Sequence, residues 1–566
     1  MLGLKLVDWI VIVVYLFGIT FIGFWAVRKV RSSASFFIGD RKFGKIMMAF
    51  FMFGSGTHSD QAVSVASKTY RSGASGIWYQ WLWLFVTPFF WLIAPFFRRM
   101  RAVTTGDYFE IRYGRSVSGL YAAMGILPLL VAIGVMLKGS GAIVEAVSGD
   151  AISSELAIIA MTVIFLIYGI AGGLSAAIAT NFVQGLLTVV LSFLILPFAL
   201  AKVGGMSGLR QSISDADMLS LVSPGEITLF YIIVIAFNAL VGWVTMPETM
   251  VNCAAGKTEM EGRIGVTTGI FGKRICTIAW MLTGLCAVVM YANLADPDLA
   301  YGKMAHDLLP EIAPGLLGLF IACLLASVMS TCDSLMVVAS ALFTENIYKK
   351  FIVVGKSDKH YTLVGRIASA LVVILGIYVA FNLESVVEGL EFYWMLSALM
   401  GIAFWAGLFW RRATSAGAWA ATLTSLGLFL LTSEKPLGIP WDFNAYFADK
   451  LPAFMLWDGK LYLPWQMIIY LSAGFVVLVL ASLFTKKVPA ENLDKFYGCL
   501  RTPVGPDEPE TEPFTIPSGT EPGPRNVLIQ HPDFEIPRPT LIGIGGFLAA
   551  WLGVGLLIGA VYWIIQ

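Results

Sequence analysis

The feature that most constrains this chain is the recurrence of long apolar runs along almost its whole length. Of its 566 residues, 57% are hydrophobic and only 13% are charged. About fourteen runs are long enough to cross the ~30 Å hydrocarbon core of a bilayer as helices. The expected spans are 7–28, 44–69, 74–97, 117–146, 153–173, 176–201, 227–252, 262–292, 313–345, 361–385, 391–411, 413–433, 464–485 and 541–565. The chain is therefore expected to be an all-α polytopic membrane protein.

The distribution of basic residues predicts how these spans are oriented. Lysine and arginine gather in alternate loops, as in 28–45, 98–115, 349–359, 411–412 and 486–487. Loops rich in basic residues stay on the cytoplasmic side of a membrane. Both termini are therefore expected outside, in a multi-pass protein of the cell membrane. Residues 486–540 are polar and proline-rich, which predicts a flexible cytoplasmic linker before the last span.

Two of the predicted helices carry interruptions that a lipid-facing helix could not tolerate. Residues 54–61 (GSGTHSDQ) place glycines, His58 and Asp60 at mid-membrane depth, and residues 243–248 contain Pro247 followed by Glu248. Broken backbone and charge are accepted in a membrane only where they line a protein-enclosed cavity. Two interrupted helices about five spans apart point to an inverted-repeat transporter. The alternative is that Gly54 and Gly56 only allow close helix packing.

Five motifs then give the chain a specific resemblance. They are FFIGDRKFG at 36–44, TGDYFEIRYG at 105–114, YGIAGGLSAAIATNFVQ at 168–184, SVMSTCDS at 327–334 with FTENIYK at 343–349, and GLFWRR at 407–412. In order and spacing they resemble the sodium:solute symporter family over about residues 1–430. The resemblance implies a LeuT-type fold with two inverted repeats of five helices, sodium as the coupling ion and no enzymatic activity.

This resemblance also implies a division of the chain. The expected segments are 1–43 (first helix and inner loop), 44–201 (first repeat), 202–226 (external loop), 227–412 (second repeat), 413–485 (two accessory helices), 486–540 (linker) and 541–566 (last helix). A fourteenth helix after a long loop is similar to the sodium/sugar branch of the family. We therefore expect a small polar solute, a sugar or sugar acid, as the cargo.

The family's sodium ligands can be carried over to matching positions. Ser330 and Thr331 match the paired hydroxyl ligands, and the resemblance adds the carbonyl oxygens of Ser327, Gly54 and Thr57. Hydroxyls and unwound carbonyls suit a hard cation. Alternatively, these hydroxyls only bond to carbonyls of their own helix.

A second cation site is expected to differ from the family pattern. Relatives commonly carry aspartate where this chain has Asn181, whereas Asp333 lies one turn after Ser330, close to Ser334. We expect the carboxylate to have moved to the other helix. An intramembrane aspartate needs a cation, a proton or a base, and a structural pair with Lys273 or Lys138 is the alternative.

Several polar residues are candidates for substrate binding. Gln61 and Gln80 lie where sugar transporters of the family place polar ligands, and amides suit hydroxyl-rich cargo. Lys138 lies deep in its span, so it is expected either to pair with Asp60, Glu248 or Asp333 or to bind an anionic cargo. Asp60 and Glu248 complete the candidate set.

Three classes of function remain open from the sequence. The first is sodium-coupled import of a sugar, a sugar acid, another organic anion or an amino acid. An intramembrane enzyme has little support, because the four histidines are scattered. A channel or sensor that has lost coupling is the third, kept open by Asn181.

Overall fold

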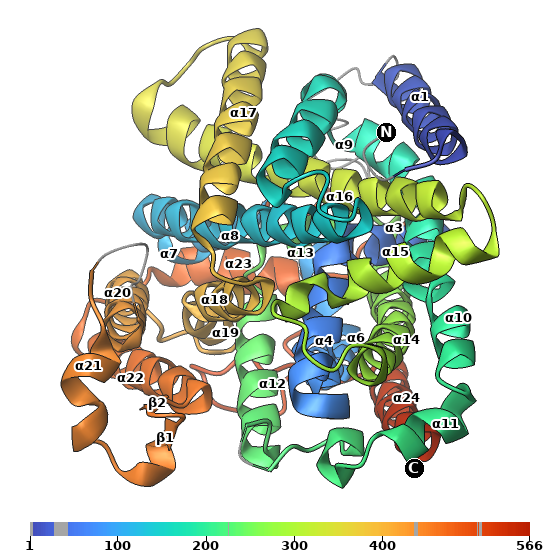
Figure 1. The fold of residues 1–566 in the computed structure, drawn as a ribbon. Helices are drawn as coiled ribbons and strands as arrows, with labels where there is room; N and C mark the ends of the chain where they lie inside the picture. Colours follow the sequence, from blue (N-terminus) through green and yellow to red (C-terminus); the bar gives the residue numbers. More distant parts are fainter. Residues whose placement is uncertain are drawn as a thin grey trace.

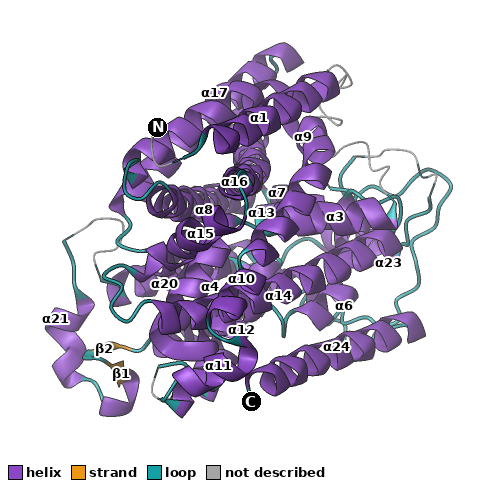
Figure 2. Cartoon of the chain, turned by 45° about the vertical axis from the view of Figure 1, so that its right-hand side comes forward, coloured by secondary structure: helices purple, strands orange, loops and turns teal. Residues whose placement is uncertain are grey.

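The computed structural model describes residues 4–27, 44–102, 104–224, 226–434, 440–506, 508 and 512–566, without the side chains of 20, 22–27, 55, 164, 165, 167–182 and 251. Helices dominate it, and one two-stranded hairpin projects from the bundle (Figure 1, Figure 2). In the described residues, nine helices are long and apolar enough to span a membrane, or ten if one bent pair counts as a span. Shorter apolar helices include Leu6–Ile19, Lys45–Gly54 and Ser154–Val163. The predicted all-α membrane architecture is thus confirmed, without a fixed count of fourteen.

The region expected to form the first repeat begins with a broken helix. Its elements are α3 (Lys45–Gly56), α4 (Ser59–Ser72), η2 (Gly73–Ile77), α5 (Trp78–Trp81), α6 (Thr87–Arg99), α7 (Thr105–Tyr113), α8 (Arg115–Val147), α9 (Ser154–Leu194) and α10 (Leu196–Lys202). The spans expected at 153–173 and 176–201 thus fall in one assigned helix, α9, followed by α10. Helix α9 packs along α1 (Leu6–Val27), α3 and α16.

The region expected to form the second repeat also begins with a broken helix. After α11 (Gly205–Ser212) and η3 (Ala216–Leu219) come α12 (Leu229–Trp243), α13 (Pro247–Ala254), α14 (Glu259–Met290), η4 (Pro297–Leu299), α15 (Ala300–Ile312), α16 (Leu316–Ala341), η5 (Leu342–Ile352), α17 (Asp358–Asn382), α18 (Val386–Ala398) and α19 (Gly401–Phe409). Helix α14 packs against α3 and α4 of the first broken helix and against α13 of the second, so both broken helices adjoin α14.

The remaining elements surround this centre. They are α20 (Ser415–Thr432), α21 (Phe443–Phe447), η7 (Ala448–Lys450), η8 (Ala453–Met455), β1 (Leu456–Trp457), β2 (Lys460–Leu461), α22 (Leu463–Phe484), α23 (Ala490–Arg501) and α24 (Leu541–Ile565). The strands pair antiparallel. Helices α20 and α22 pack on each other, and α24 lies along α6 (Figure 2).

Glycines bring α14 very close to α3. A Cβ added at Gly269 would lie 2.6 Å from the Cβ of Met52, and one at Gly265 would lie 2.6 Å from the Cβ of Met48. Small residues allow this approach between membrane helices. The close packing carries the next turn of α14, including Lys273, to the carboxyl end of α3.

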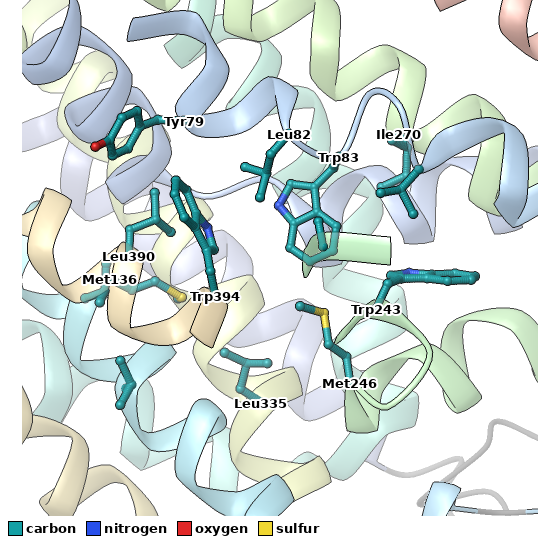
Figure 3. Packing of buried hydrophobic residues seen from close by; sticks show 14 of the residues in the cluster. Tyr79, Leu82, Trp83, Met136, Trp243, Met246, Ile270, Leu335, Leu390 and Trp394 are labelled. Atoms are coloured by element: carbon teal, nitrogen blue, oxygen red, sulfur yellow. The ribbon is translucent and has the colours of Figure 1, made fainter. Parts of the chain in front are cut away.

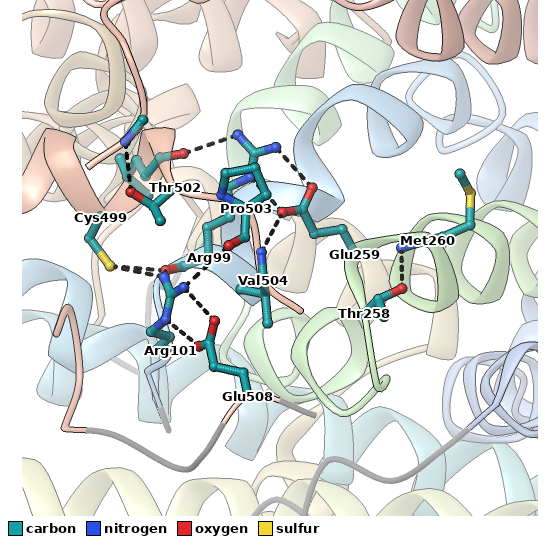
Figure 4. Close-up of polar contacts among 12 residues, drawn as sticks. Arg99, Arg101, Thr258, Glu259, Met260, Cys499, Thr502, Pro503, Val504 and Glu508 are labelled. Atoms are coloured by element: carbon teal, nitrogen blue, oxygen red, sulfur yellow. Dashed lines mark hydrogen bonds and ion pairs between the residues drawn. The ribbon is translucent and has the colours of Figure 1, made fainter. Parts of the chain in front are cut away.

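The segment after α22 corrects one expectation. Residues 486–540 were expected to be a flexible linker, yet the described part contains the amphipathic helix α23, which buries Leu493, Phe496, Tyr497 and Leu500. Arg101 binds Glu508 of this segment, and Arg99 donates both to the Leu500 carbonyl of the segment and to Glu259 of α14 (Figure 4). Proline content predicted the lack of regular structure, but not these tertiary contacts. We call this end of the bundle, with Arg99, Arg101, Arg112, Arg411 and α23, the basic end.

Candidate functional site

The first interruption is an unwound step of two residues between α3 and α4. Thr57 and His58 are extended, with φ of −122° and −131°. The side chain of Gln61 bridges this unwound step. Its Oε1 accepts a hydrogen bond from the His58 backbone N–H at 3.3 Å. Its Nε2 lies 3.3 Å from the Gly56 carbonyl oxygen and 3.0 Å from His58 Nδ1. The break predicted at 54–61 is therefore confirmed, and Gln61 is largely engaged within it.

The second interruption separates α12 from α13. The two helices meet at an angle of 64° across residues 244–246. Proline is favoured at the first position of a helix, and Glu248 then lies in the first turn, where a carboxylate interacts well with the helix dipole. Glu248 Oε2 is buried and has no hydrogen-bond partner among the described residues. The interruption predicted at 243–248 is also confirmed.

Oxygen atoms from two helices converge beside the first break. Ser330 Oγ on α16 lies 3.5 Å from the Gly54 carbonyl oxygen at the end of α3. Thr331 Oγ1 lies 3.3 Å from the carbonyl of Ser327, and Thr57 Oγ1 is buried with no partner among the described atoms. A set of hydroxyl and carbonyl oxygens of this kind fits the ligand preference of Na⁺. All five predicted ligands thus lie on α16 or at the end of α3.

The possible second cation site is described only on one helix. Asp333 is buried, with 3% exposure, and Ser334 Oγ donates to the Ser330 carbonyl at 3.0 Å. Asn181 belongs to α9, which packs along α16, but its side chain lies outside the described set. The exchange of carboxylate between these helices stays a prediction.

A cavity opens between the two broken helices, lined by residues of α3–α6, α8, α12–α14, α16 and α18. It encloses about 940 Å³ of space, including its open side. The rings of Trp83, Trp243 and Trp394 border it, together with Met246 and Leu335 (Figure 3). Aromatic walls of this kind can cover the apolar face of a small ring-shaped solute.

Four of the five substrate-site candidates line this cavity, namely Asp60, Gln61, Gln80 and Glu248. Asp60 is buried, 3.3 Å from His58 Nδ1. The Gln80 amide makes no side-chain hydrogen bond with another described residue, which leaves it open to a ligand.

Lys138 is placed elsewhere. It is half-buried on α8, outside the cavity lining, and its charge acts on Glu155 at the start of α9. Among the described residues no hydrogen bond or ion pair joins Lys138 to Asp60, Glu248 or Asp333, and Lys138 does not line the cavity in which a cargo would bind. A lysine inside a membrane helix is easily recognised, but the direction of its side chain depends on the rotation of that helix.

Two cavity cations on α14 take the position that Lys138 was expected to fill. Lys273 Nζ donates to the Gly56 carbonyl at the end of α3, where a cation complements the helix dipole. Arg274 donates from Nη1 to the Gln80 carbonyl and is wholly buried. Sequence reasoning considered Lys273 only as a partner for Asp333 and missed Arg274. The available signal was a Lys-Arg pair within an apolar span.

A polar layer lies next to the cavity wall formed by Trp394. The Tyr79 ring lies 5.2 Å from that of Trp394, and the Tyr79 hydroxyl donates to Glu391. Lys68 and Ser72 at the end of α4 both bond to Glu226, which precedes α12. Burial alone would raise the pKa of Glu226, but the Lys68 ammonium and the Ser72 hydroxyl hold it below its usual value. This layer ties the far ends of the two broken helices together.

Comparisons with known proteins agree with this geometry. The chain is 24% identical over 477 residues to a sodium/glucose cotransporter of Vibrio parahaemolyticus, covering 78% of this chain and 87% of the relative. It is also 24% identical over 437 residues to an osmoregulated proline transporter of Bacillus subtilis, covering 74% and 87%.

The fold has a similar solved structure. That of a Na⁺-coupled sialic acid symporter has a TM-score of 0.71 and 18% identity, and the match covers 86% of this chain and 99% of that one. The predicted LeuT-type fold is confirmed. The model of the sodium:solute symporter family matches residues 36–425. This chain belongs to the sodium:solute symporter family.

Proposed function

We propose that this sodium-coupled symporter imports a sugar or sugar acid by alternating access. Membership of the family makes the chain a sodium-coupled transporter of a small solute and not an enzyme. The observation that carries the proposal is the convergence of Ser330 Oγ and the Gly54 carbonyl at 3.5 Å, beside a cavity with amide, carboxylate and aromatic walls. The glucose and sialic acid named for similar proteins support a sugar-like cargo.

The unwound step at Thr57 and His58 gives coupling a physical route. The proposed sodium ligands Gly54 and Thr57 precede or form this step, and Asp60 and Gln61 follow it into the cavity wall. An ion bound at the carbonyls fixes the same backbone that positions the cargo ligands. Ion and cargo then each favour the same conformation, which is the requirement for coupled binding.

We also propose that the basic end faces the cytoplasm. Arg99, Arg101, Arg112 and Arg411 gather there, in agreement with the preference of basic loops for that side. On this orientation the layer of Lys68 and Glu226 lies on the outer side of the cavity. The cell membrane is the proposed location.

Uptake into proteoliposomes tests the proposal. Purified protein would be given labelled glucose, galactose, glucuronate, gluconate or proline under an inward sodium gradient, with choline replacing sodium as the control. We expect sodium-dependent accumulation of at least one sugar or sugar acid above its equilibrium level, collapsed by a sodium ionophore. Accumulation of proline alone would replace the sugar with an amino acid, and equilibration without sodium dependence would indicate an uncoupled pathway.

A further inference from the structure

Arg274 stands out among the fully buried arginines. Arg101 is paired with the Glu508 carboxylate, and Arg112 donates to the four carbonyls of Gly407, Trp410, Arg411 and Ala413. Among the described residues, Arg274 donates only to the carbonyl of Gln80. Its Nε is buried without a partner, and within the described part of the chain no carboxylate oxygen lies within 4 Å of its guanidinium.

A buried guanidinium that has neither an anion nor enough carbonyl acceptors for its N–H groups is strongly disfavoured. Inside a membrane protein such a group normally marks a ligand or ion pathway. Arg274 lines the cavity, so an anion there can reach it. The missing partner of Arg274 is therefore expected to arrive with the cargo.

The other charges of the cavity do not fill this role. Lys273, the neighbour of Arg274, is directed to the Gly56 carbonyl, and its charge acts on Asp60 and Glu248. An organic anion that enters together with a sodium ion brings no net charge into the cavity.

We infer that the cargo carries a carboxylate, which binds Arg274 beside Gln80. A guanidinium offers two parallel N–H groups to a carboxylate, a geometry that an ammonium cannot supply. In the lining of the same cavity, the Gln80 amide and the buried Trp394 Nε1, neither of which has a hydrogen-bond partner among the described residues, can bond hydroxyl groups. This inference rests on the proposed symport and makes the cargo a hydroxylated carboxylate rather than a neutral sugar.

Matched pairs of solutes test the inference on the intact protein in lipid nanodiscs. Thermal unfolding would be followed in NaCl and in choline chloride with glucuronate against glucose, galacturonate against galactose, and gluconate against glucitol. We expect at least one acid, and not its neutral partner, to raise Tm in sodium. Equal stabilisation by acid and neutral partners, or no stabilisation by any acid, would overturn the inference.

Variants of Arg274 locate the effect. Arg274→Gln is expected to weaken binding of the active acid at least tenfold, and Arg274→Lys to recover part of the loss because it restores charge without the bidentate geometry. Lys303→Gln, a substitution in α15, serves as the control variant and would be compared at matched expression. Loss of acid binding in Lys138→Gln but not in Arg274→Gln would make Lys138 the anchor and contradict our assignment.

The sodium response separates this inference from the proposed function. Sodium alone is expected to raise Tm in wild type and in Arg274→Gln, but not in Ser330→Ala. A sodium response without any acid response would refute only the carboxylate cargo. No sodium response in wild type would instead count against the proposed symport. If Arg274→Gln does not fold, the wild-type solute pairs and Arg274→Lys still decide the matter.

Discussion

Arg274 in the central cavity and Arg101 at the basic end are both fully buried, but they have different partners. Arg101 binds both oxygens of Glu508, at 2.6 and 2.8 Å, and Arg99 beside it binds both oxygens of Glu259, at 2.7 and 2.9 Å (Figure 4). Arg274 has one carbonyl and no described carboxylate. The same type of side chain thus has its anion built into the fold in one region and lacks it in the other.

This difference distinguishes residues that stabilise the fold from residues that are available to bind a ligand. Removing one member of a buried pair leaves an uncompensated charge and should destabilise the fold. Removing a ligand-binding group from the cavity should reduce transport and change the stability of the unliganded protein little. The following experiments measure transport, stability or both.

The largest expected effect is on transport, in the double variant Ser330→Ala with Thr331→Ala. Two oxygens leave a site that water cannot replace equally well, so sodium-driven uptake should be abolished. The unliganded protein should unfold within about 1 kcal/mol of wild type, because only small hydroxyls are lost. Uptake with unchanged sodium dependence would remove these residues from the ion site.

At the basic end, Arg101→Gln should show the opposite pattern. Glu508 would be left without its partner, which costs about 3–5 kcal/mol of unfolding free energy. The double variant Arg101→Gln with Glu508→Gln should recover part of this loss, and denaturant unfolding in micelles measures both. If the single variant is as stable as wild type, the ion pair does not hold this segment.

Variants of Asp333 test whether its carboxylate takes part in cation binding. We expect Asp333→Asn to reduce sodium-dependent uptake roughly tenfold or more, a loss near the 1.4 kcal/mol that tenfold represents. Asp333→Ser combined with Asn181→Asp should restore part of the uptake, since α9 packs along α16. A double variant no better than Asp333→Ser alone would indicate a structural role for Asp333.

The smallest expected effect concerns the partly exposed pair of Lys68 and Glu226. Because the pKa of Glu226 is lowered in the fold, the pair stabilises the protein above the ordinary carboxylate pKa of about 4.3. Wild type should therefore melt above Glu226→Gln at pH 7, and the difference should shrink as the pH falls through and below that value. A difference that stays constant from pH 7 to pH values well below this carboxylate pKa would contradict the ion pair.

Local sequence was enough to predict the broken helices. The run of glycines and polar residues at 54–61 and Pro247 with Glu248 cannot form lipid-facing helix, whatever surrounds them. The same argument predicted a cavity lined by Asp60 and Glu248. Their place in a cavity can be predicted because polar and helix-breaking residues are incompatible with a lipid-facing position.

Contacts between distant helices could not be predicted in the same way. Lys138 and Arg274 both lie in apolar spans, and only the packing of α8 and α14 decides which one meets the cavity. The glycines that press α14 onto α3 suggest closeness but not rotation. Likewise, the composition of 486–540 predicted an irregular chain, although α23 and Glu508 dock onto α6 and α7.

The pairing of Arg101 with Glu508 also has a consequence for the order of assembly. The two residues are 407 positions apart in the chain. At roughly 5–20 residues per second, a ribosome needs about 20–80 s to pass from one to the other. During that interval the helices before Arg101 can insert, but their basic end still lacks the acid that will cover it. The bundle is therefore completed late, when the segment before the last helix leaves the ribosome.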